Sequence, residues 1–137
     1  MNDDSDLEAI DQLVTRFYSA FENTVEAPEL ARITECFVEG ARIVRCASGG
    51  PEFYSVAEFA APRIALLSGG GLTGFSERET SASTEQIGGV AFRSSRYTKS
   101  GILNGEAYTG SGAKQFLIVR LPEAWRISAL SWVDSEA

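Results

Sequence analysis

The sequence predicts an α+β fold, in which a cone-shaped, curved antiparallel or mixed sheet packs against three helices from the N-terminal half. Apolar residues recur with helical spacing in the first half, three glycines at 69–71 end it, and strand-like segments rich in Ser, Thr and Val follow. Because the long strands follow the helices instead of alternating with them, the order is typical of α+β proteins. Such a sheet, covered on one side, curls, so we expect a pocket where helices and sheet diverge.

Three helices are expected before the glycines. Residues 6–22 carry apolar side chains at steps of three and four, the period of a helix with one buried stripe. Pro28 suits the first position of a second helix over 29–37. A third helix is expected from Val56 to about Leu67, capped by Ser55 and kinked or shortened at Pro62, because proline lacks an amide hydrogen.

The strands are delimited by turn residues. A β-branched segment at 41–46 predicts a short strand, which Gly49-Gly50-Pro51 ends. Four further strands are expected over 72–87, 90–99, 107–121 and 125–133, and Asn104-Gly105 lies in the turn before the third of these. The second half is therefore expected to form an antiparallel meander.

Length and composition indicate one domain spanning residues 1–137 and exclude several classes of partner. The net charge of −7 argues against nucleic-acid binding and against docking on anionic lipid. No apolar segment is long enough to span a membrane, and the two cysteines, Cys36 and Cys46, lack a metal-binding or redox spacing. We therefore expect a cytoplasmic protein with reduced thiols and no cofactor.

Histidine is absent from the chain. A Ser-His-Asp triad, a Cys-His pair and a His-based zinc site therefore cannot form within it. We expect no metal site, and any general acid or base must be Glu, Tyr or Lys. Glu79 and Tyr97 are the candidates, since the aspartates lie near the termini, away from the expected pocket: Asp3, Asp4, Asp6, Asp11 and Asp134.

Four segments carry a resemblance to a known superfamily: LVTRFYSAF at 13–21, CFVEGA at 36–41, WRI at 125–127 and SWVDSE at 131–136. With the predicted order of elements, the chain resembles the nuclear-transport-factor-2-like superfamily, which includes SnoaL-like polyketide cyclases, ketosteroid isomerase and scytalone dehydratase. The resemblance implies a cystatin-like cone and says little about chemistry.

The resemblance also suggests which positions face the pocket. The catalytic tyrosine and two aspartates of ketosteroid isomerase correspond to Phe17, Arg45 and Lys114, none of which has the required group. Steroid-type isomerisation is therefore disfavoured. Two cations facing the pocket would favour an anionic or carbonyl-bearing ligand, although a one-residue shift in register would place either on the outer face. Their alternative role is structural pairing with Glu77, Glu79, Glu85 or Glu106.

Aromatic residues would form the apolar wall of this pocket, or simply the core. The predicted ligand-binding residues are Phe17, Phe21, Arg45, Phe59, Lys114 and Phe116. Strict alternation along 125–133 places Leu130 and Trp132 on one face and Trp125 and Ile127 on the other. Since helices can cover only one face, we predict a homodimer through the outer face, involving Leu130 and Trp132.

Two functions fit these observations. The first is a dimeric protein that binds a small apolar or anionic organic molecule in its pocket. The second is a small cyclase, dehydratase or isomerase of the polyketide-cyclase kind, which uses Glu, Tyr or Lys in place of the usual Asp and His. A protein-interaction module is a third possibility.

Overall fold

The computed structural model describes residues 4–135, so Asp3 and Glu136 lie outside the described residues. Three helices are present: α1 (Asp4–Ser19), α2 (Leu30–Thr34) and α3 (Val56–Ser68). The six strands are β1 (Phe37–Ala47), β2 (Gly50–Ser55), β3 (Leu72–Ile87), β4 (Val90–Leu103), β5 (Glu106–Arg120) and β6 (Trp125–Asp134). Among the helices of the described chain, none has the length and apolarity needed to cross a membrane.

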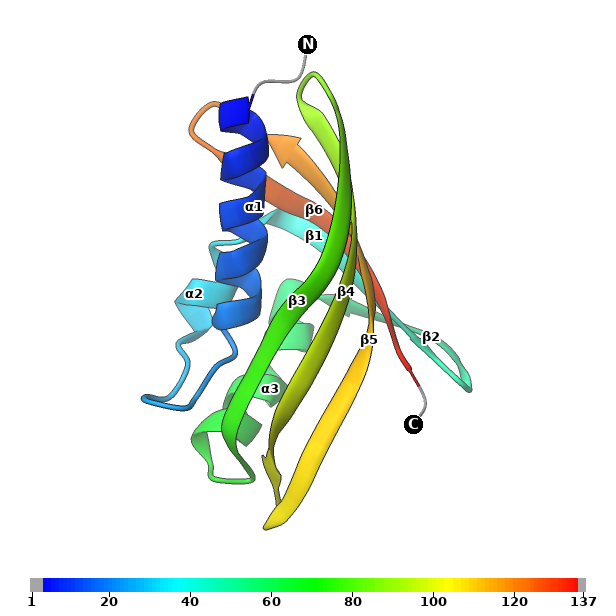
Figure 1. The fold of residues 1–137 in the computed structure, drawn as a ribbon. Helices are drawn as coiled ribbons and strands as arrows, with labels where there is room; N and C mark the ends of the chain where they lie inside the picture. The colour runs from blue at the N-terminus through cyan, green and yellow to red at the C-terminus, as the bar shows by residue number, and fades with distance from the viewer. Residues whose placement is uncertain (1–3, 136–137) are drawn as a thin grey trace.

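The strands form one mixed sheet in the order β2-β1-β6-β5-β4-β3. Only the β1–β6 pair is parallel, and the other neighbours are antiparallel. The sheet is strongly curved, and α1 and α3 lie one after the other along its concave side (Figure 1). The predicted α+β architecture, a curved sheet packed against three N-terminal helices, is therefore confirmed.

The helical stripe of α1 fills one half of the concave side. Ile10, Leu13, Val14 and Phe17 are almost fully buried, and each such apolar side chain contributes roughly 1.5–3 kcal/mol when removed from water. The ring of Phe17 makes edge-to-face contacts with three other phenylalanines, at centroid separations of 5.3–5.8 Å. The apolar stripe of α1 is thus part of the buried core.

Asn23 fixes the other end of the concave side. Its amide nitrogen donates to the backbone oxygens of Leu67, at 3.0 Å, and Leu72, at 2.7 Å. Its side-chain oxygen accepts from the backbone nitrogen of Phe75 at 2.7 Å. The segment after α1 is thus tied to the connection between α3 and β3.

Some local boundaries differ from the expectations. Helix α2 ends at Thr34 and β1 begins at Phe37, whereas a helix over 29–37 and a strand from 41 were expected. Strand β1 ends before Gly49-Gly50-Pro51 as expected, but Gly50, with φ +118°, pairs with Ala47 in a hairpin and begins β2, which was not predicted. Helix α3 is not shortened at Pro62 but continues to Ser68. Its start is stabilised by the predicted Ser55 cap, whose hydroxyl accepts from the backbone nitrogen of Glu58 at 3.1 Å.

The predicted facing of Leu130 and Trp132 is wrong. Both are buried on the concave face, together with Trp125 and Ile127. A β-bulge at Ser128 causes this, because Leu117 pairs with Ala129 while the next residue, Ile118, pairs with Ile127. One extra residue in β6 interrupts the alternation, so side chains before and after it point to the same side.

Candidate functional site

A cavity of about 370 Å³ lies between α3 and the concave face of the sheet. Its walls come from α1, from α3 and from every strand except β2. The apolar part is mainly aromatic and aliphatic: Phe17, Phe21, Phe59, Leu67, Phe75 and Trp132. The polar part, hereafter the cavity cluster, consists of Arg45, Arg63, Lys99, Lys114, Glu77 and Asp134. The volume is within the usual range of small-molecule sites.

Five of the six predicted ligand-binding residues line this cavity: Phe17, Phe21, Arg45, Phe59 and Lys114. Arg45 pairs with Glu52 and Trp132 across the neighbouring strands, and this register turns its side chain to the concave face. Phe116 is not in the lining; it is fully buried and packs edge-to-face against Phe17 at 5.5 Å. Ligand binding by these residues stays a prediction.

The charged side chains of the cavity are arranged by depth. Side-chain exposure rises from Lys114, at 7%, and Glu77, at 10%, through Lys99, at 15%, to Asp134, at 31%, and Arg45, at 41%. Lys114 and Glu77 therefore form the floor, and Arg45 lies at the rim. Charges at the floor are the least screened by solvent, so their effect on a bound molecule is the strongest.

Lys114 lies in a cage of aromatic rings. Its Nζ is 4.0 Å from the ring centre of Tyr97, 5.5 Å from that of Trp132 and 5.6 Å from that of Tyr18. Its carboxylate partner is Glu77, with Nζ and Oε1 3.4 Å apart. Burial lowers the pKa of Lys114, and the charge of Glu77 offsets this only in part.

Asp134 organises the other side of the cavity. Its Oδ1 accepts hydrogen bonds from the hydroxyl of Tyr97 and from Lys99 Nζ, the latter at 3.2 Å, and its Oδ2 lies 3.6 Å from Arg45. Burial disfavours the carboxylate, but the hydrogen bond from Tyr97 and the charge of Lys99 outweigh it and hold the pKa of Asp134 below its ordinary value. Burial and the bond to Asp134 raise the pKa of Tyr97, which therefore stays a neutral donor.

Arg63 reaches the cavity from α3. Its guanidinium carbon lies 4.1 Å above the ring centre of Phe59 and 5.3 Å from that of Trp132, and Nη1 donates to the backbone oxygen of Phe59 at 2.9 Å. Within residues 4–135 it forms no salt bridge. Burial lowers the pKa of Arg63, yet guanidinium stays charged in proteins. The cavity thus contains a cation whose charge is not matched.

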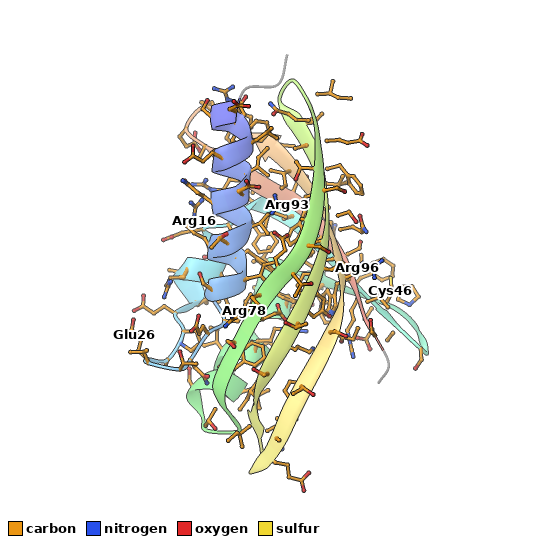
Figure 2. All side chains as sticks on the ribbon, viewed as in Figure 1. Arg16, Glu26, Cys46, Arg78, Arg93 and Arg96 are labelled. Atoms are coloured by element: carbon orange, nitrogen blue, oxygen red, sulfur yellow. The ribbon has the colours of Figure 1, made fainter. Side chains whose placement is uncertain are left out.

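A second group of polar residues, hereafter the Arg93 cluster, lies between α1 and the sheet. Arg93 projects toward α1, whereas Arg96 lies on the opposite face of the sheet (Figure 2). Arg93 donates to both carboxylate oxygens of Glu79, to Asp11 and to Thr84. Ser95 donates to Glu79 at 2.6 Å and is 2.7 Å from the hydroxyl of Tyr18.

These contacts revise the acid–base candidates. Glu79 is bound by Arg93 and does not line the cavity. Tyr97 is also absent from the lining, and its hydroxyl is hydrogen-bonded to Asp134. The expectation that the aspartates lie away from the pocket is wrong for Asp134, which follows Trp132 by two residues and therefore shares its face. Among the predicted pairings, Glu77–Lys114 is present. In the described part of the chain, no three His, Cys, Asp or Glu side chains are grouped as metal ligands.

Sequence reasoning missed Arg63. Phe59, Arg63 and Leu67 are spaced four residues apart on α3, which places all three on one face of the helix. An arginine within an apolar helical stripe was the available signal, because such a residue is directed toward the core or a cavity.

Comparisons with known proteins identify the fold. No family model and no curated protein matches the sequence. A proposed aromatic ring hydroxylase from Novosphingobium aromaticivorans has a TM-score of 0.82 at 15% identity, over 100% of this chain and 94% of that one. A nuclear-transport-factor-2-like superfamily protein from Salmonella enterica has a TM-score of 0.79 at 11% identity, over 98% and 94%.

A third solved structure, a proposed dehydratase of the nuclear-transport-factor-2-like family from Streptomyces avermitilis, has a TM-score of 0.75 at 12% identity. The match covers 98% of this chain and 99% of that one. Other similar structures are described as having a cystatin-like fold. The chain therefore has the nuclear-transport-factor-2-like, cystatin-like fold that its sequence motifs suggested, and at these identities the likeness concerns the fold alone.

Proposed function

We propose that this protein binds a small organic anion that has a flat apolar body. The support is the composition of the cavity: aromatic walls combined with four cations, Arg45, Arg63, Lys99 and Lys114, against two carboxylates, Glu77 and Asp134. The cavity is thus positive within a chain whose net charge is −7. An excess of positive charge held inside an acidic protein favours a negatively charged ligand.

The observation that carries the proposal is the state of Arg63. An arginine that is largely removed from water and has no carboxylate partner among residues 4–135 favours an anion that supplies one, because guanidinium binds carboxylates in a bidentate manner. The aromatic rings of Phe59 and Trp132, 5.4 Å apart and edge-to-face, lie directly beside it. The acidic group of the ligand would bind Arg63 while its apolar body lies against these two rings.

Calorimetric titration of a matched pair of probes tests the proposal. Naphthalene-2-carboxylate and naphthalene-2-carboxamide have the same apolar body and differ in charge. We expect the carboxylate to bind about 10- to 100-fold more tightly, the value of charge-assisted hydrogen bonds in a partly dry site. The substitution Arg63→Met should remove the preference for the carboxylate, because methionine keeps an unbranched apolar side chain without the charge.

The matched control is Arg78→Met, because Arg78 is exposed on β3 and absent from the cavity lining. This variant should retain the preference of the unmodified protein. Equal affinity for the two probes, or a preference that survives Arg63→Met, would contradict the proposal.

An enzyme of the cyclase, dehydratase or isomerase kind is the second candidate function. The pair of Lys114 and Glu77 at the floor favours it, because a desolvated amine beside a carboxylate can move a proton on a bound carbonyl compound. The assay is deuterium incorporation next to the carbonyl of 2-tetralone in heavy water, followed by NMR. Catalysed exchange that is lost in Glu77→Gln would support an enzyme, and exchange at the buffer rate would exclude proton transfer on this ketone.

We also propose that two copies associate through the outer face of the sheet. The residues differ from those predicted, since Leu130 and Trp132 are inside. Phe92, Leu117 and Ala129 are neighbours across β4, β5 and β6, and Phe92 and Leu117 are exposed large apolar residues. The helices cover the other face (Figure 1). A second copy presents the same apolar row, which allows mutual burial without opposed charges at its centre.

Sedimentation velocity at micromolar concentration measures this association. Leu117→Glu should convert the dimer to a monomer, since it places two like charges in the proposed interface. Val25→Glu is the matched control, because Val25 is the most exposed large apolar residue described and lies between α1 and α2. A monomeric unmodified protein would remove the proposal.

A further inference from the structure

The chain contains only two lysines, Lys99 and Lys114, and both line the same cavity. Lysine is commonly a surface residue that supports solubility, so this distribution points to a use of the amines inside the cavity. The two are held differently. Lys99 bonds to Asp134 at 3.2 Å, whereas Lys114 lies deeper, among aromatic rings, with Glu77 at 3.4 Å.

Resting on the proposed function, we propose that Lys114 forms an imine with a carbonyl-bearing ligand whose carboxylate is bound by Arg63. The ligand class is an oxo acid with an apolar body. Arg63 and Lys114 both approach the indole of Trp132, at 5.3 and 5.5 Å from its ring centre. A molecule lying along this ring would have its acidic group at Arg63 and its carbonyl carbon at Lys114 Nζ.

Each step of the reaction can be assigned to residues at the floor. The carboxylate of Glu77 accepts a proton from the ammonium of Lys114, and the freed amine attacks the carbonyl carbon to form a carbon–nitrogen bond. The carbonyl π electrons move to oxygen, which takes up a proton from the nitrogen to give a carbinolamine. Protonated Glu77 then donates its proton to the hydroxyl, which leaves as water as the iminium forms. No oxidant or reductant is consumed.

The environments of the two lysines support Lys114, and not Lys99, as the nucleophile. For Lys114 burial lowers the pKa, which favours the neutral nucleophile. For Lys99 burial acts in the same direction, but interactions with Tyr108 and Asp134 outweigh it and raise the pKa. Lys99 thus stays a fixed cation, and the two amines of one cavity are separated in reactivity by their neighbours.

Reductive trapping tests the proposal on the unmodified protein. The protein is incubated at pH 7 with 4-formylbenzoate and sodium cyanoborohydride, which converts an imine to a stable secondary amine, and the adduct is located by peptide mass spectrometry. The chain offers three primary amines: its amino terminus, Lys99 and Lys114. We expect the adduct at Lys114, its loss in Lys114→Arg, and slower labelling in Glu77→Gln.

Two controls separate a site from general amine reactivity. Arg96→Lys adds an amine on the outer face, and labelling of that amine at the rate of Lys114 would overturn the proposal. Benzaldehyde lacks the acidic group, so it should label Lys114 more slowly than 4-formylbenzoate. No adduct at Lys114 would also overturn the proposal, whatever the variants show.

The trapping and binding experiments can fail separately. Preferential binding of naphthalene-2-carboxylate without an adduct at Lys114 would support the anion-binding site and overturn the proposal of an imine. Labelling of Lys114 by both aldehydes at equal rates would retain the amine chemistry and remove the role of Arg63 in anion binding.

Discussion

The concave face of the sheet carries two groups of charged residues built from similar side chains. In the Arg93 cluster one arginine donates to two carboxylates, and the hydroxyl of Ser95 donates to one of the Glu79 oxygens as well. In the cavity cluster four cations face two carboxylates across an open volume. Burial of charge alone therefore does not mark a functional site. An unmatched charge beside empty space does so far better.

The difference follows from the helices that cover each group. Helix α1 packs directly over the Arg93 cluster, and Asp11 on α1 completes it. Helix α3 lines the cavity, and the charged side chain that it contributes to the lining is a further cation, Arg63. Helix α1 therefore adds a carboxylate to an arginine–glutamate pair of the sheet, whereas α3 adds a cation to sheet residues whose charge is already positive in sum.

The largest expected effect is on folding, from Arg93→Met. The substitution leaves Glu79 charged and largely buried without its main partner, which should lower the free energy of unfolding by about 3 kcal/mol. Urea denaturation followed by circular dichroism measures it. Arg78→Met on the neighbouring strand is the control and should change stability by less than about 0.5 kcal/mol. A loss in Arg93→Met no larger than in the control would show that the Arg93 cluster is not structural.

An intermediate, pH-dependent effect is expected from Asp134→Asn. The pKa of Asp134 is lowered in the folded protein, so its carboxylate stabilises the fold above its unfolded pKa, and this contribution is lost as the pH falls through the folded value. The variant should be about 1–2 kcal/mol less stable than the unmodified protein at pH 7, the value of hydrogen bonds to a charged group.

Urea denaturation at pH 7 and at pH 3 measures this dependence. The difference between the two proteins should narrow at pH 3, because acid removes from the unmodified protein the charge that the variant lacks at every pH. A difference that stays constant between these pH values would show that the charge of Asp134 does not stabilise the fold.

The sequence predicted the fold well because its signals are local. Helical spacing, the cap at Ser55 and turn residues such as Asn104-Gly105 act within a few positions. The facing of Trp132 could not be predicted, because the bulge at Ser128 depends on pairing with β5 and leaves no local pattern. This error displaced Trp132 from the predicted site, whereas Asp134 was set aside because it lies near the end of the sequence. Arg45 and Lys114 were suggested by the resemblance, whose implied register the structure reproduces.

Arg63→Met should change stability less than either Arg93→Met or Asp134→Asn. Replacing Arg93 by methionine should lower the free energy of unfolding strongly, whereas replacing Arg63 by methionine should change it by less than about 1 kcal/mol. It removes a cation–π contact with Phe59 and one hydrogen bond, relieves repulsion among the cavity cations, and leaves no carboxylate unpaired. Urea denaturation of Arg63→Met and of Arg93→Met measures the loss of unfolding free energy in each variant. Equal losses would mean that Arg63 supports the fold as Arg93 does, and the excess charge of the cavity would then need no ligand to explain it.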